Sequence, residues 1–336
     1  MDNTRSVDGT AVGEAPRRRP SRGAWIAVAV AVAVLLGGAF AYYNTNVLTS
    51  ARICHGWVTP DEAARALGGG FGRVSASEDS ATECTIRQSG WLPGQDKRLS
   101  LRSDTEQAGF PFRSGAWEIS ATRHVMSGGT HGAYDSYGGW ALLPAACAKS
   151  GAGGGAAPVL RAAVTSEDTT ADADGMGDLL AAAARALVHG AADCAAPGHG
   201  DAATRTLAPS PARATDLGKV CGIGGFRLAK AQGPTGRRVT ERVIGSPGQG
   251  SLYCDLFFAG KEDDAFARLA VVSDPTFVAA FAGRDVTRAE CAGRETVFAL
   301  DLKYFDSSQR AATHLPDTAG FTEEFTQAAR AAMRCA

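Results

Sequence analysis

The chain has 336 residues, of which 21% are charged and 7% are aromatic, and its formal net charge is −1. A charge this close to zero lacks the basic excess of a nucleic-acid-binding protein, so we expect no nucleic-acid partner. The length is sufficient for more than one folded domain, each with its own hydrophobic core.

The N-terminal segment predicts a cytoplasmic tail followed by a membrane helix. Residues 1–22 are polar and rich in arginine, without apolar periodicity, which is typical of a disordered segment. Residues 23–43 carry no charge, and about twenty apolar residues span the roughly 30 Å hydrocarbon core of a bilayer. Several arginines precede this run, the last being Arg22, and the next basic residue is Arg52. The positive-inside rule therefore places the tail in the cytoplasm and the rest of the chain outside it.

The apolar run fits either a cleaved signal peptide or an uncleaved signal-anchor. Ala39-Phe40-Ala41 resembles a signal-peptidase site, and a mature chain would then begin near Tyr42. However, the run is longer than the roughly 7–15 residues of a typical signal-peptide core. We therefore favour a single-pass signal-anchor, with residues 44–52 as a spacer between the membrane and the first folded domain.

The chain contains eight cysteines, and all of them follow this spacer. An even number of cysteines spread through a secreted chain indicates a disulfide framework. A zinc site would need cysteines or histidines at short spacing, whereas no two cysteines lie within twenty residues of each other. We accordingly expect disulfides, and neither a metal nor a cofactor.

The cysteine spacing predicts two copies of one module. Cys84 follows Cys54 by 30 residues, and Cys254 follows Cys221 by 33. The pattern R-L-x-[LV]-x-S-D begins 14 residues after the second cysteine of each set, at Arg98 and at Arg268. Two homologous domains are therefore expected, at residues 53–195 and 217–336. The segment 196–216 between them is rich in alanine, proline and threonine, which is typical of a linker.

The duplication also limits the disulfide connectivity. Eight cysteines allow 105 pairings, but only three remain if both domains pair alike and no bridge crosses the linker. We choose the pairing of neighbours, because it ties each opening segment to an inner strand and each closing helix to its sheet. The predicted pairs are Cys54 with Cys84, Cys147 with Cys194, Cys221 with Cys254, and Cys291 with Cys335.

Local patterns predict strands between an opening and a closing helix. In the first domain, Thr59 is suited to cap a helix that ends at Gly68, and a closing helix lies near residues 176–192. In the second, Asp274 begins a helix that runs through Ala282. Strands are expected near residues 72–77, 82–88, 99–101, 160–164, 238–244, 251–258, 268–273 and 298–304. This order predicts the α+β class, with an antiparallel sheet and flanking helices in each domain.

The start of the first domain resembles a known family. Cys54 is followed by T-P-x-E-A-x-x-x-L-G at residues 59–68 and then by a cysteine on a predicted strand. This arrangement is similar to that of small actinobacterial surface lipoproteins and secreted proteins of unknown function. The likeness covers part of the first domain only, because in the second domain Cys221 is followed by glycines instead of the T-P-x-E motif. The chain also departs from the lipoproteins in that no lipobox precedes Cys54. It implies an extracytoplasmic location and a fold, but no activity.

A search for catalytic motifs favours a role without catalysis. The chain lacks G-x-S-x-G, S-x-x-K and H-E-x-x-H. The glycines near residue 70 follow a predicted helix and lack the Lys-Ser/Thr pair of a phosphate-binding loop, so they are interpreted as a turn. We therefore predict a membrane-anchored protein that binds a ligand or an envelope protein. A cell-envelope hydrolase and a structural subunit of an envelope complex remain the alternatives.

One aromatic-rich insertion distinguishes the first domain. Asp104 and Cys147 are 43 residues apart, whereas the matching positions Asp274 and Cys291 are 17 apart. Aromatic side chains on glycine-rich loops can form a ligand surface, although they more often complete a core. The candidate surface comprises Trp117, His124, His131, Tyr134, Tyr137 and Trp140. A metal site at the two histidines is disfavoured by their spacing.

Overall fold

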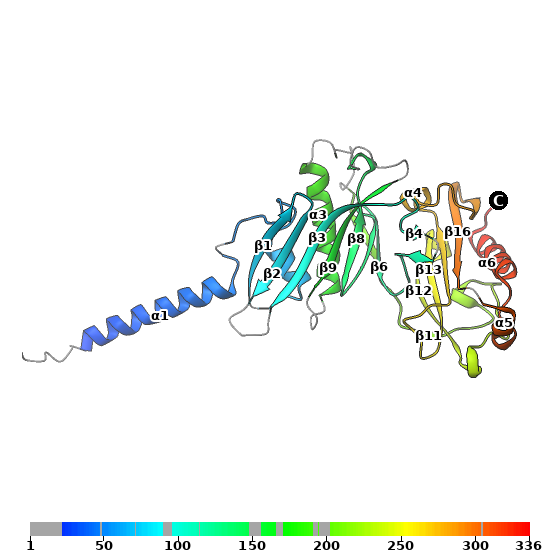
Figure 1. Ribbon diagram of the computed structural model, residues 1–336, viewed down its shortest axis with the longest axis horizontal. Coiled ribbons are helices and arrows are strands. Elements are labelled where there is room, and N and C mark those ends of the chain that lie inside the picture. The colour runs from blue at the N-terminus through cyan, green and yellow to red at the C-terminus, as the bar shows by residue number, and fades with distance from the viewer. Residues whose placement is uncertain are drawn as a thin grey trace, which may run out of the picture.

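The computed structural model describes a long helix and a body of two large antiparallel sheets, one small two-stranded sheet and flanking helices (Figure 1). It describes residues 22–47, 49–70, 72–89, 96–113, 115–147, 156–165, 171–190, 194, 202–303 and 305–336. The expected tail, apart from Arg22, lies outside the described residues. The α+β class is as predicted.

Helix α1 (Arg22–Asn44) projects away from the body (Figure 1). Its segment Trp25–Asn44 has a mean hydropathy of 2.2 and is long and apolar enough to cross a membrane. Its C-terminal end is held by hydrogen bonds, because the Asn44 carbonyl accepts one from the Gly72 amide at 3.3 Å. The side chain of Asn46 likewise accepts one from the Val74 amide at 2.9 Å. The helix is thus fastened directly to the first sheet.

The first sheet has eight strands, all paired antiparallel. Their spatial order is β1 (Arg73–Ser80), β2 (Glu83–Ser89), β3 (Lys97–Glu106), β9 (Ala157–Val164), β8 (Gly138–Leu142), β7 (Gly132–Asp135), β6 (His124–Gly128) and β10 (Thr204–Leu207). Side chains alternate between the two faces, so Leu99 and Leu101 on β3 point into a core while Arg98 and Arg102 point to solvent.

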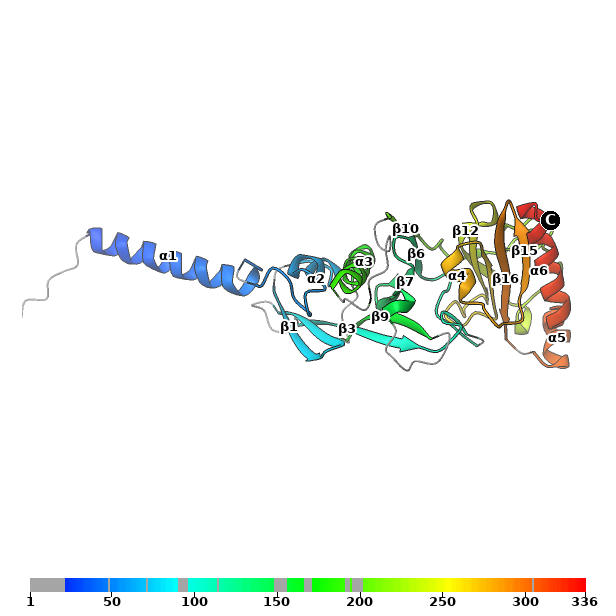
Figure 2. The ribbon, with the colours of Figure 1, turned by 90° about the horizontal axis from the view of Figure 1, so that it is seen from above.

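Two helices cover one face of this sheet (Figure 2). Helix α2 (Pro60–Ala66) begins at Thr59, the predicted N-cap, which also forms a capping box because Thr59 and Glu62 exchange hydrogen bonds. Helix α3 (Ala173–Gly190) packs beside it. In the part of the chain that the structure describes, no helix lies over the opposite face of strands β1 to β3 (Figure 2). The side chains on that face are polar.

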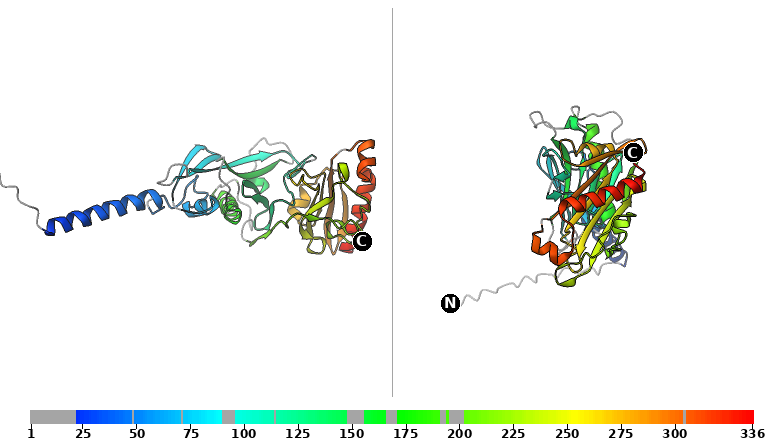
Figure 3. Two further views of the ribbon diagram at one scale, coloured as in Figure 1. Left: turned by 90° about the horizontal axis from the view of Figure 1, so that it is seen from below. Right: turned by 90° about the vertical axis from the view of Figure 1, so that its right-hand side faces the viewer.

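The second sheet has six antiparallel strands. Their order is β11 (Arg213–Ala214), β12 (Val239–Ser246), β13 (Ser251–Phe258), β14 (Ala267–Val272), β16 (Arg294–Leu302) and β15 (Thr287–Cys291). The helices of this module are α4 (Pro275–Ala279), α5 (Ser307–Thr313) and α6 (Thr318–Met333). Helix α6 crosses the outer face of the sheet, where Phe321 and Phe325 enter the core (Figure 3).

The insertion covers the inner face of the second sheet. It includes the short strands β4 (Phe112–Arg113) and β5 (Ala116–Trp117). Apolar residues of the insertion form one continuous core with those of the second sheet and α4. The two expected domains therefore have separate cores and also share a third. We call the contact between the insertion and the second sheet the junction.

The expected linker is in part a structural element of both sheets. Within 196–216, the described residues contribute strand β10 to the first sheet and strand β11 to the second. Composition alone favoured an irregular segment, but the edges of β6 and β12 offer unpaired backbone groups that an extended chain can satisfy.

The two modules share a strand order. In the first sheet it is β1-β2-β3-β9-β8, and in the second it is β12-β13-β14-β16-β15. Four disulfides join Cys54 to Cys84, Cys147 to Cys194, Cys221 to Cys254, and Cys291 to Cys335. These are the predicted neighbour pairs. In each module the first bridge reaches the second strand of the hairpin, at Cys84 on β2 and Cys254 on β13, and the second follows the closing helix.

Candidate functional site

The six residues of the candidate ligand surface do not form one exposed patch. Trp117 and Trp140 belong to the core of the junction, with 6% and 0% of their surface exposed, whereas Tyr134 belongs to the core of the first module. His124 stacks on Tyr134 with ring centroids 4.9 Å apart. Of the six, only Tyr137 is largely exposed, at 68%. Most of the aromatic side chains of the insertion therefore serve packing.

His131 links the two modules. Its Nε2 lies 3.0 Å from the Asp274 carboxylate, and its ring meets the edge of Phe277 at 5.3 Å. Asp274 also caps α4, because it accepts hydrogen bonds from the Thr276 and Phe277 amides. Burial opposes ionisation of Asp274, but the His131 contact and the α4 amides outweigh it and lower the pKa of this carboxyl. His131, which the sequence placed in the candidate ligand surface, thus takes part in a contact between the two modules.

A row of alternating charges crosses the second sheet on the face that meets the insertion. Arg242 on β12 is the register partner of Asp255 on β13, which in turn pairs with Arg268 on β14. Arg268 then pairs with Asp301 on β16. Opposite charges placed directly across strands stabilise a sheet by about 0.2–1 kcal/mol per pair. We call these four residues the charge ladder.

Three members of the charge ladder bind the backbone of the insertion. Asp301 accepts a hydrogen bond from the Gly115 amide, and Asp255 accepts one from the Ala121 amide. Arg268 donates to the carbonyl of Trp117. Each of these contacts has a length of 3.2 Å. The insertion therefore runs across the strands, and the ladder satisfies three of its backbone groups, of which the Ala121 amide is bonded in a buried position.

Asp255 is the most deeply buried member of the ladder, with 2% of its surface exposed. Burial raises its pKa to about 7, although Arg268, the Ala121 amide and Arg242 act in the opposite direction. The proton equilibrium of this one carboxyl is therefore coupled to the docking of the insertion.

Aromatic stacking accompanies the polar contacts. The ring of Phe112 stacks on Phe281 with centroids 4.2 Å apart, and it meets Trp117 edge-on at 5.3 Å. Tyr253 and Phe277 complete its surroundings. Such pairs add about 0.5–1.5 kcal/mol beyond the burial of apolar area. Phe112 is accordingly the apolar centre of the junction.

A polar cleft of about 500 Å³ opens beside the ladder. It is lined by Gly115, Arg268 and Asp301 of the junction, and by Asp264 and Lys303. Asp264 forms an ion pair with Lys303, and this hydrogen bond lowers the pKa of Asp264. Asp264 is therefore held as a carboxylate and does not have the raised pKa of a general acid.

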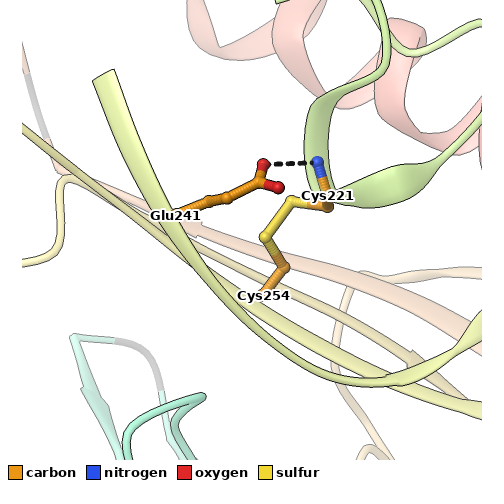
Figure 4. A group of neighbouring side chains, drawn as sticks. All are labelled: Cys221, Glu241 and Cys254. Atoms are coloured by element: carbon orange, nitrogen blue, oxygen red, sulfur yellow. Dashed lines mark hydrogen bonds between the residues drawn. A yellow bond between two sulfur atoms is a disulfide. The ribbon is translucent and has the colours of Figure 1, made fainter. Parts of the chain in front are cut away.

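Glu241 lies beside the Cys221–Cys254 disulfide in a compact group (Figure 4). Its carboxylate accepts a hydrogen bond from the Cys221 amide at 2.9 Å and another from Arg213 at 2.8 Å. The two sulfurs are bonded to each other, so neither is the thiolate that a metal ion would need. The group holds strand β11 and the start of the second module against β12.

No protein-family model, curated protein or solved structure matches the chain.

The charge ladder is a feature of the junction that the sequence did not reveal. Asp255 and Arg268 stand in strands whose neighbouring positions on the same face are apolar, such as Tyr253 beside Asp255 and Ala270 beside Arg268. An isolated charge on an otherwise apolar strand face could have indicated a buried polar contact. The register that aligns the four residues is a property of the folded sheet.

Proposed function

We propose that the chain is a single-pass membrane protein whose folded body lies outside the cytoplasm and has a non-catalytic binding role. Helix α1 supports the anchor, because none of its apolar span is buried against the body and lipid would cover it. The four disulfides support an oxidising compartment. The arginines that precede the helix support a cytoplasmic N-terminus.

The fastening of α1 supports a body held close to the membrane surface. The Arg73 guanidinium lies 4.5 Å from the ring centroid of Tyr42, in addition to the hydrogen bonds at Asn44 and Asn46. The first module would therefore stand directly on the bilayer, and the second module would be held farther away (Figure 1).

We also propose that the two modules arose by duplication. Their common strand order and the placement of their disulfides support this. The strand register differs in one detail. Cys84 lies opposite Leu101, the fourth residue of the repeated motif, whereas Cys254 lies opposite Leu269, the second residue of the motif. A shift of two residues keeps the same side chains on the core face. Duplication is therefore compatible with the different register of the two hairpins.

One observation carries the binding role. In both modules a row of residues crosses the sheet next to the second cysteine, on the face away from the closing helix. In the second module this row is the charge ladder, which binds an extended segment. In the first it is Ser77, Thr85, Ser100 and Ala163, aligned by register. Ser77 and Ala163 are exposed, so among the described residues this row is an uncovered counterpart of an occupied docking face.

Co-purification tests this role. The full chain is isolated from membranes in mild detergent, alone and with Ser77→Arg and Ala163→Arg on the open face. We expect a partner protein to co-purify in stoichiometric amount with the unaltered chain. The same partner should be absent from both variants, whose thermal stability should be unchanged. Gln327→Arg, on the exposed side of α6, is the matched control and should retain the partner. Equal recovery with all four chains would refute a binding role for the open face.

A further inference from the structure

A cavity of about 500 Å³ lies beside α4 in the second module. Its apolar wall is formed by Pro275, Val278, Ala279 and Ala282. Its polar rim is formed by Ser273, Arg288, Arg294 and Glu295. Small-molecule sites have this size and character, with an apolar lining and a few polar groups that orient the ligand.

The wall of the cavity is held in place by the junction. Phe277 and Phe281, which flank Val278 in the chain, are buried in the shared core, and Asp274 caps the helix. Ser273 is fixed by a buried hydrogen bond to Thr296 at 2.7 Å. The apolar surface of α4 is therefore present before a ligand arrives, which lowers the entropic cost of binding.

The rim carries two guanidinium groups and one carboxylate. Arg288 is fixed, because it contacts Glu295 at 2.6 Å and donates to the Phe281 carbonyl at 3.0 Å. Arg294 is exposed, and within the described ranges its guanidinium has neither an ion pair nor a side-chain hydrogen bond. One positive charge at the rim is thus left without a counter-charge. A guanidinium in this state is suited to a carboxylate or phosphate group.

We infer that this cavity binds a small organic anion with an apolar body, whose charged group faces Arg294 and whose apolar part lies on Val278, Ala279 and Ala282. This inference goes beyond the binding role proposed for the open face of the first module and assigns a separate ligand site to the second module. The second guanidinium at the rim, that of Arg288, is already paired with Glu295. A neutral ligand of the same shape would bury the same apolar area but leave Arg294 unpaired.

A water-soluble fluorinated pair of compounds tests the inference. The full chain in nanodiscs is titrated with 4-(trifluoromethyl)benzoate and with 4-(trifluoromethyl)benzamide, followed by ¹⁹F NMR against empty nanodiscs. We expect saturable binding of the benzoate and roughly ten-fold weaker binding of the benzamide, as expected for the loss of one charge-assisted hydrogen bond. Phenyl phosphate as a third ligand shows whether carboxylate or phosphate is preferred. Equal affinity for the charged and neutral compounds would overturn the inference.

Variants locate the site. Arg294→Gln should weaken benzoate binding about ten-fold, and Ala279→Phe should abolish it by filling the cavity from an exposed helix position. The control is Ala319→Phe in a similarly apolar groove of about 580 Å³ beside α6, which contains Glu323 and no cation. Loss of binding in the control, or no loss in Ala279→Phe, contradicts the assignment. A flat titration refutes the ligand site alone, because the anchor and the open face are tested by other measurements.

Discussion

The Asp255 carboxylate accepts a hydrogen bond from the Ala121 backbone amide, with the oxygen and nitrogen 3.2 Å apart. The two residues are 134 positions apart in the chain and belong to different modules. This contact places an ionisable group between the modules, in a core that is otherwise mainly apolar.

The first prediction concerns pH. Burial raises the folded-state pKa of Asp255 to about 7 from the ordinary value of 3.8. The stability that this carboxyl contributes is therefore complete below the ordinary value and is lost as the pH rises through 7. We expect the free energy of unfolding to fall by about 2.5 kcal/mol between pH 5 and pH 8 on this account. Asp255→Asn should remove most of that dependence in urea denaturation, whereas Asp301→Asn should not. An unchanged pH profile in Asp255→Asn would show that another group is responsible.

The second prediction concerns the apolar centre of the junction. Phe112 is fully buried among Trp117, Tyr253 and Phe281, so Phe112→Ala should cost about 3–5 kcal/mol. Tyr137→Ala, at an exposed position of the same insertion, should stay within about 0.5 kcal/mol of the unaltered chain. Denaturation of the full-length protein measures both. If Phe112→Ala lowered the free energy of unfolding as little as Tyr137→Ala, the insertion would not be part of the core.

The third prediction concerns a glycine in helix α3. Alanine normally stabilises a helix over glycine by about 1 kcal/mol, but a Cβ at Gly177 would lie 2.5 Å from the Tyr134 ring. That ring is buried and stacked on His124, so Gly177→Ala should destabilise the protein by about 1–3 kcal/mol. Gly190→Ala in the same helix meets no atom within 4 Å and should be neutral or stabilising. A stabilised Gly177→Ala chain would contradict this packing.

Local structure was largely predictable from the sequence because its causes are local. The Thr59 capping box, the alternation on β2 and β3, and the Asp274 cap of α4 depend on nearby residues. Helix α4 nevertheless ends at Ala279 rather than Ala282. The chain there turns so that Phe281 can enter the shared core.

The site was less predictable because it depends on contacts between distant segments. The composition of the insertion indicated either a ligand surface or core packing, and nothing in the sequence says that Phe112 meets Phe281 across the junction. The alignment of Asp255 with Arg268 likewise requires the register of two strands. The pairing of residues 204–207 with β6 was hidden by a linker-like composition.

The fourth prediction concerns the disulfides. Cys291–Cys335 fastens the end of α6 to the edge strand β15, closing a loop of 44 residues. Replacing both cysteines by serine should cost about 2–5 kcal/mol of stability. The loss should appear in the second module first, as faster hydrogen exchange in α6 than in α3. Equal protection of α6 with and without the bridge would contradict this role.

The most direct test of the central claim is the location of the C-terminus relative to the membrane. Two reporters are each fused after Ala336. Alkaline phosphatase is active only outside the cytoplasm. Green fluorescent protein fluoresces only in the cytoplasm, because it does not fold correctly when it is exported in an unfolded state. We expect high phosphatase activity in the membrane fraction and no fluorescence. Background phosphatase activity with bright fluorescence would place the disulfide-bonded body in the cytoplasm and contradict the proposed topology.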